Sequence, residues 1–158
     1  MKRREFFTSL LKPVKQRKEE QPPLFPPYFN DIKDFEKCRE CESKACVAAC
    51  EEQIIVIVDA KPSLDFSKSG CTFCDACAIA CEDGVLTVEN KQTLPKLMID
   101  MLGCLAWQKT ICNMCKDVCL ENAIEFSGLF NPQINDRCTG CGFCVGVCPT
   151  QAIKGGEG

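Results

Sequence analysis

The stretch Cys138-Thr-Gly-Cys-Gly-Phe-Cys-Val-Gly-Val-Cys-Pro149 decides the fold of this chain. Its four cysteines follow the spacing C-x2-C-x2-C-x3-C, with a proline after the last, which suits a cubane [4Fe–4S] cluster. Three cysteines two residues apart wrap one loop around a cubane and point three thiolates at three irons. We expect the fourth cysteine to begin a short helix, face the other way and ligate a neighbouring cluster.

The chain has 158 residues and 16 cysteines, and the cysteines fall into four groups of four. Group one is Cys38-x2-Cys41-x4-Cys46-x3-Cys50, group two is Cys71-x2-Cys74-x2-Cys77-x3-Cys81, group three is Cys104-x7-Cys112-x2-Cys115-x3-Cys119, and group four is Cys138-x2-Cys141-x2-Cys144-x3-Cys148. Groups two and four match the bacterial ferredoxin run, while groups one and three carry longer loops and predict looser or more exposed clusters. Sixteen ligands, at four per cubane, predict four [4Fe–4S] clusters.

Other uses of cysteine fit the spacing less well. Disulfides belong to an oxidising compartment, but no apolar signal segment precedes the cysteines, and C-x2-C-x2-C is awkward for bridging. Zinc prefers two C-x2-C pairs a dozen or more residues apart, so it is an alternative mainly for groups one and three. Redox pairs of the thioredoxin type need a βαβ context, which the sequence lacks.

Composition excludes several classes of function. Histidine is absent, which rules out His-ligated haem, Rieske clusters, Cys2His2 zinc sites and nucleophile–His pairs. The formal charge is −3, divided into +4 on residues 1–30 and −7 on the remainder, so no general nucleic-acid affinity is expected. No apolar run of about 18 residues occurs, so we expect no membrane span. No phosphate-binding glycine loop occurs either, and we predict that the protein is not an enzyme.

The gaps between the groups predict an α+β fold of two small bacterial-ferredoxin-like modules, each with short strands and two short helices around its clusters. The predicted boundaries are 1–29 for a basic arm and proline-rich linker, 30–90 for the first module and 91–158 for the second. Short strands are expected at 54–58, 64–66, 85–88, 123–126 and 152–154. Modules of about 60 residues are too small for a self-sufficient core, so the apo-protein should be largely unfolded.

Short linkers favour pairing of group one with group two and of group three with group four. With crossed fourth cysteines, the four predicted ligand sets are Cys38, Cys41, Cys46 with Cys81; Cys71, Cys74, Cys77 with Cys50; Cys104, Cys112, Cys115 with Cys148; and Cys138, Cys141, Cys144 with Cys119. A nested arrangement, which pairs group one with four and group two with three, is the alternative.

The first thirty residues differ from the rest. Lys2-Arg3-Arg4-Glu5-Phe6-Phe7 resembles a twin-arginine export motif, but no apolar segment follows, so export is not expected. The arm is either a solvated basic tail or a partner-docking helix with Phe6, Phe7, Leu10 and Leu11 on one face. The prolines at 22–27 predict a stiff connector that holds the arm away from the body.

Several of these features together resemble the ferredoxin-type NapF family. The stretch Cys104-Leu-Ala-Trp-Gln108, the prolines before group one and a short Arg-Arg start without an apolar segment are similar to NapF proteins. Group one departs from the family pattern, which keeps two residues between successive cysteines. The resemblance implies a cytoplasmic, non-catalytic protein whose partner is NapA, the nitrate reductase catalytic subunit, before NapA is exported. The implied role is maturation or redox poising of NapA, and the alternative is an electron-transfer subunit of a larger oxidoreductase complex.

Overall fold

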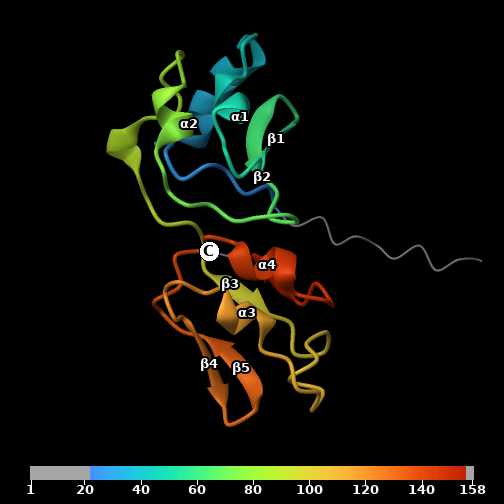
Figure 1. Ribbon diagram of the computed structural model, residues 1–158. Helices are drawn as coiled ribbons and strands as arrows, with labels where there is room; N and C mark the ends of the chain where they lie inside the picture. The colour runs from blue at the N-terminus through green and yellow to red at the C-terminus, as the bar shows by residue number, and fades with distance from the viewer. Residues whose placement is uncertain (1–21, 156–158) are drawn as a thin grey trace, which may run out of the picture.

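The computed structural model describes residues 22–155 and shows two stacked halves (Figure 1). The helical elements are η1 (Ile32–Arg39), α1 (Ala45–Ala48), α2 (Ala76–Ile79), η2 (Val88–Asn90), α3 (Met114–Asp117) and α4 (Phe143–Val147). The strands are β1 (Ile55–Val58), β2 (Lys61–Leu64), β3 (Leu97–Ile99), β4 (Ile124–Ser127), β5 (Phe130–Ile134) and β6 (Ile153–Gly155). Each half holds one antiparallel hairpin, β1 with β2 and β4 with β5, while β3 pairs with β6.

The two hairpins confirm the strands expected at 54–58 and 123–126. Asp59 and Ala60 both have positive φ, at 49° and 63°, which is the conformation of a two-residue hairpin turn. The expectation for the returning strand was wrong, because β2 begins at Lys61 and contains Pro62. A two-stranded sheet tolerates this proline because the missing N–H can face away from the partner strand.

The strand expected at 85–88 does not form, although its counterpart in the second half, β6, pairs with β3. The segment that faces residues 85–92 is Pro26-Pro27-Tyr28: the amide of Thr87 donates to the Tyr28 carbonyl at 2.9 Å and that of Gln92 to the Pro27 carbonyl at 2.9 Å. Two successive prolines have no N–H to return, so a regular ladder cannot form.

The proline-rich segment is therefore part of the fold and is more than a connector between the arm and the body. Pro26, Pro27 and Tyr28 are among the most fully buried side chains, and Leu24, Phe25 and Phe29 pack against the same core. The Phe25 ring stacks on that of Phe35 with 4.6 Å between centroids. The apolar length of this segment supplies core that the small first half would otherwise lack. Residues 1–21, with the predicted docking face on Phe6, Phe7, Leu10 and Leu11, lie outside the described residues.

The expectation that the fourth cysteine of a group begins a short helix was wrong. The third cysteine of each group lies in a helix, and the fourth follows the helix end, as Cys46 and Cys50 do around α1. The three residues between these cysteines span about one helical turn, so the helix carries the third ligand inward and releases the fourth beyond its end.

Replacing Phe35 with alanine is expected to destabilise the first half by about 3–5 kcal/mol, because the ring is fully buried against Phe25 and Phe29. The measurement is anaerobic denaturant unfolding of the iron-loaded protein. Ile32→Ala is the control in the same helix, since Ile32 is 54% exposed and its truncation should change stability by no more than about 0.5 kcal/mol. Equal stability of the two variants would contradict the placement of residues 24–29 in the core.

Candidate iron–sulfur centres

In the first half, the eight cysteines line two cavities, four cysteines to each. The first set, which lines one cavity, is Cys38, Cys41, Cys46 and Cys81. The second set, which lines the other, is Cys50, Cys71, Cys74 and Cys77. Each set takes three cysteines from one group and the last cysteine from the other group. Ile57 and Val85 shield the first set, and Ile54 and Ile55 shield the second.

The second half repeats this arrangement. The fourth set, which lines a further cavity, is Cys104, Cys112, Cys115 and Cys148. The third set surrounds the buried Cys144, whose thiol lies near those of Cys119, Cys138 and Cys141. These positions are those of the sequential arrangement, and no cavity brings Cys148 to Cys38 among the described residues. The role of each cysteine as a ligand remains a prediction.

A turn that recurs after the last cysteine of every group positions that cysteine. The residue three places later has positive φ in all four groups, and these residues are Gln53, Gly84, Asn122 and Gln151. In each turn its amide donates to the carbonyl of the cysteine, over 3.0–3.4 Å. The repetition shows that the four groups share one backbone design even where their cysteine spacing differs. Sequence reasoning missed this repeat because glutamine, glycine and asparagine share no obvious pattern.

The same turns direct backbone amides at sulfur. The Sγ atoms of Cys81, Cys119 and Cys148 accept hydrogen bonds from the amides of Leu86, Ala123 and Ala152 at 3.3–3.4 Å. The Sγ of Cys71 accepts one from the amide of Phe73 at 3.4 Å. A hydrogen bond to a thiolate sulfur stabilises its negative charge and is one of the features that set the potential of a cluster.

The two regular loops differ in how they tolerate a strained backbone. In group four the positive-φ positions are Gly140 and Gly142, which have no Cβ and adopt this conformation without steric strain. In group two the matching positions are Phe73 and Asp75, at 54° and 64°. The amide of Asp75 donates to the Tyr28 hydroxyl at 3.1 Å.

Lys91 also supports the group two loop. Its Nζ donates to the Phe73 carbonyl at 2.9 Å and lies 2.7 Å from the Asp75 carboxylate. Surrounding contacts of this kind allow a left-handed residue other than glycine to persist. They also place the buried Tyr28, and the proline-rich segment it comes from, beside the second set.

Burial makes several of the cysteine thiols hard to ionise without a bound cation. Burial, with repulsion from neighbouring thiolates, raises the pKa of the Cys77 and Cys144 thiols to about 12 and that of Cys115 to about 11. Burial also raises the pKa of Cys38, Cys46 and Cys71. Four thiolates in such a site would repel one another, and a bound metal centre such as iron would offset that repulsion.

The donor sets suit a cluster. Each set offers four thiols, three from one group and the last from another, and all-thiolate donors of this kind suit [4Fe–4S]. Apart from the cysteines, the cavities are lined mainly by apolar side chains.

The irregular groups retain their sets through local contacts. In group one Lys44 adopts positive φ before α1, and its ammonium donates to the Cys38 carbonyl, which closes the longer loop. In group three Leu105 lines the fourth-set cavity, Ala106 is 1% exposed, and the Trp107 indole donates to the Pro132 carbonyl at 3.0 Å. The seven-residue loop is therefore anchored to the hairpin of the second half.

Trp107, the single tryptophan of the chain, is expected to report on the fourth set. An iron–sulfur cluster absorbs where indole emits, so a nearby cluster should quench its fluorescence. Cys112→Ser should raise Trp107 emission several-fold, whereas Cys41→Ser, in the other half, should leave it close to wild type. Emission spectra of anaerobically reconstituted variants, matched for protein concentration, provide the measurement. A similar rise in both variants would contradict the assignment.

Two family models match the chain. The 4Fe-4S dicluster domain matches residues 16–86, and the 4Fe-4S binding domain matches residues 132–154. These matches, with the cysteine sets, establish that the chain has iron–sulfur binding domains. The described part of the chain contains no helix that is long and apolar enough to cross a bilayer.

Curated relatives extend over most of the sequence. The ferredoxin-type protein NapF of Escherichia coli K12 is 36% identical over 135 residues, which is 81% of each chain. The protein of the same name from Haemophilus influenzae is 31% identical over 74% of this chain and 69% of its own. Subunit I of an NADH-quinone oxidoreductase from Pelobacter propionicus is 39% identical, but over 27% of this chain only.

Proposed function

Because this chain belongs to the family of ferredoxin-type NapF proteins, we propose that its sixteen cysteines hold four [4Fe–4S] clusters for electron exchange with a protein partner. The observation that carries the proposal is the convergence of the cysteines into four sets, three from one group and one from its neighbour. When bound, each cluster takes up or releases one electron. The chain holds the thiolates, directs amides at their sulfurs and limits the access of water.

The two-module division belongs to the same proposal, with residues 30–90 as one module and 91–158 as the other. Its support is that each half has its own hairpin, its own pair of short cysteine helices and its own buried cluster of apolar side chains. The residues before 30 complete the core of the first module, so its functional unit extends back to about Leu24.

We further propose that the partner is a NapA-like nitrate reductase precursor, and that the protein assists its maturation or redox poising in the cytoplasm before export. The support for this step is family membership, since the names of the curated relatives tie them to the Nap system. Residues 1–30 carry a net charge of +4, opposite in sign to the −7 of the remainder. This basic arm is the proposed docking element.

Deletion of residues 1–20 tests this step. The deletion is expected to leave iron content unchanged and to reduce co-purification of the NapA-like precursor at least several-fold, because the proposed docking surface is lost while the described body stays intact. Affinity purification from anaerobic cells, with quantitative mass spectrometry of the precursor and iron analysis, provides the measurement. Arg3→Lys with Arg4→Lys serves as a control that keeps the charge of the arm.

Two other results would change the proposal. Loss of iron on deletion would make the arm structural. Recovery of the full-length protein from the periplasm would mean that the Arg3-Arg4 motif directs export, and the cytoplasmic role would then fail.

An electron-transfer subunit of a larger oxidoreductase is the second candidate. The similarity of a 56-residue stretch to the NADH-quinone oxidoreductase subunit favours it. The two candidates differ in stoichiometry: a fixed subunit co-purifies in a constant ratio with several other subunits, whereas a maturation partner is recovered mainly with precursor that retains its export signal.

A further inference from the structure

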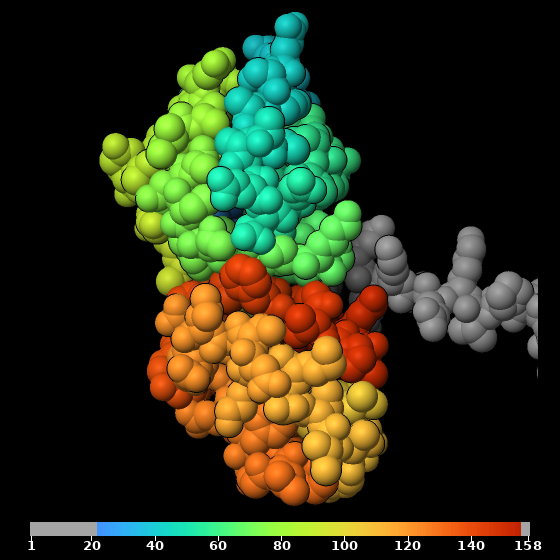
Figure 2. Space-filling model, in the orientation of Figure 1, coloured from blue at the N-terminus to red at the C-terminus, as the bar shows by residue number. Residues whose placement is uncertain are grey.

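The two halves meet through the very loops that carry cysteines of the second and third sets. The amide of Cys71 donates to the carbonyl of Cys141 at 2.6 Å. A second backbone bond crosses nearby, from the amide of Leu94 to the carbonyl of Thr139 at 3.0 Å. Figure 2 shows the green part of the first half directly against the red segment that contains α4.

Glycines make this close approach possible. A Cβ on Gly70 would lie 2.5 Å from the backbone nitrogen of Phe143 and 2.6 Å from the carbonyl oxygen of Cys141. A Cβ on Gly142 would collide with the ring of Phe66, which is 6% exposed. Val145 of α4 packs against the apolar clusters of both halves. We call this contact, formed by residues 66–71 and 139–146, the junction.

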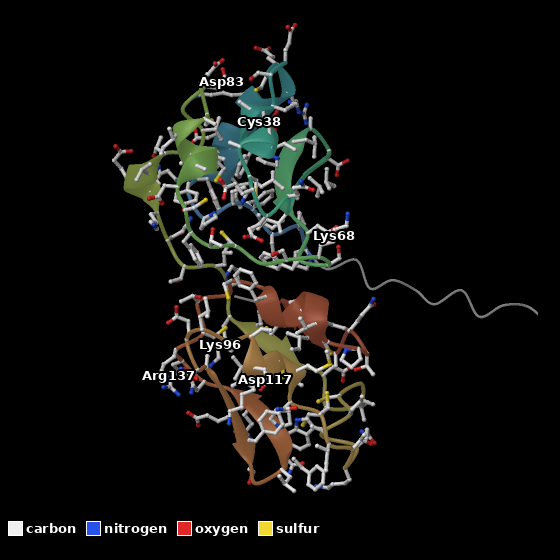
Figure 3. The ribbon with its side chains drawn as sticks, viewed as in Figure 1. Cys38, Lys68, Asp83, Lys96, Asp117 and Arg137 are labelled. Atoms are coloured by element: carbon white, nitrogen blue, oxygen red, sulfur yellow. The ribbon has the colours of Figure 1, made fainter. Side chains whose placement is uncertain are left out.

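The four cysteine sets follow one another along the molecule. Cys46 and Cys77 lie close enough to interact electrostatically, which places the first set beside the second, and Cys115 and Cys144 likewise place the fourth beside the third. Cys38 lies toward the end of the first half that is remote from the second half (Figure 3). Among the residues that the structure describes, the junction is therefore the contact that brings a cysteine of the second set against one of the third.

We propose that the junction joins the second and third sets into a single electron path, so that the chain conducts across all four sets and does not act as two independent two-cluster carriers. With clusters held by the second and third sets, one electron would pass from a reduced [4Fe–4S]1+ cluster, which would become 2+, to an oxidised neighbour, which would become 1+, with no bond or proton changed. The hydrogen bond from Cys71 to Cys141 joins the backbones of two proposed ligand residues, so the proposed path can cross the junction through the protein. This inference rests on the cluster assignment proposed above.

Gly70→Ala tests the junction, with Gly155→Ala as the matched control. Neither glycine has positive φ, but a Cβ on Gly155 meets only ordinary contact, 3.7 Å from Leu24. In fully reduced wild-type protein, four clusters in a row make three magnetically interacting neighbour pairs. The Gly70→Ala variant should lose the central pair, and its EPR spectrum should narrow to that of two separate pairs. Hydrogen exchange should show loss of protection in the peptides containing Cys71 and Leu94.

Iron analysis separates the possible failures. If the wild-type protein binds too little iron to fill both the second and the third sets, the cluster assignment itself is wrong. Full iron with an unchanged EPR spectrum, whether or not the amides lose protection, would overturn the electron path alone. If Gly70→Ala does not load iron, Gly146→Ala replaces it, because its Cβ would meet the Phe66 and Ser67 carbonyls at the milder distances of 3.0 and 3.1 Å.

Discussion

Removal of iron by a chelator under reducing, anaerobic conditions is expected to unfold most of residues 22–155. Within residues 22–155, every helix is eight residues or shorter and no strand exceeds five, so none of these elements is stable without tertiary contacts. Both apolar clusters contain cysteines of the proposed ligand sets, so loss of the clusters would leave holes inside each core. Folded domains keep only about 5–15 kcal/mol of stability, so we expect losses in both cores at once to unfold the chain.

Far-UV circular dichroism and hydrogen exchange measure this outcome. Protection in the hairpins β1–β2 and β4–β5 should fall to the level of unstructured peptide, and return of iron and sulfide should restore it. The chelator already saturated with iron is the control. A metal-free chain that keeps protected hairpins would contradict the view that clusters replace a conventional core.

Replacing Cys81 with serine is expected to empty the first set, which takes its other cysteines from group one. Iron should fall from about sixteen to about twelve per chain. Under native conditions, iodoacetamide should then label Cys38, Cys41 and Cys46, because these thiols lose their metal. The reason is geometric: Cys81 lines the cavity of group one and not that of its own loop.

The reciprocal variant Cys50→Ser is the matched control. It should release the same amount of iron but expose Cys71, Cys74 and Cys77 to the label. Peptide mass spectrometry assigns the labelled positions. Labelling of Cys71, Cys74 and Cys77 in the Cys81→Ser variant would show that each group ligates its own cluster, and labelling of Cys104, Cys112 and Cys115, in group three, would favour the nested alternative.

Local sequence patterns predicted the elements that depend on neighbouring residues alone. The apolar run at 54–58 and the segment at 123–126 form strands because each has a returning partner only two residues away. The expectation at 85–88 failed for a non-local reason: the opposing strand position is occupied by Pro26 and Pro27, which lie some sixty residues earlier and offer no N–H. Likewise β3 was missed because three residues, Leu97–Ile99, carry no pattern until β6 pairs with them.

The sequence by itself determined the four cysteine runs and hence the chemistry of the chain, because ligand spacing within a loop is a local property of the backbone. Only the tertiary structure decided which run each last cysteine faces, how deeply Tyr28 and the prolines are buried, and how Gly70 meets Cys141. These features depend on packing between segments that are distant in sequence, and cysteine spacing places no constraint on that packing. The same spacing is compatible with sequential or nested pairing, and the folded body adopts the placement in which neighbouring groups share their cavities.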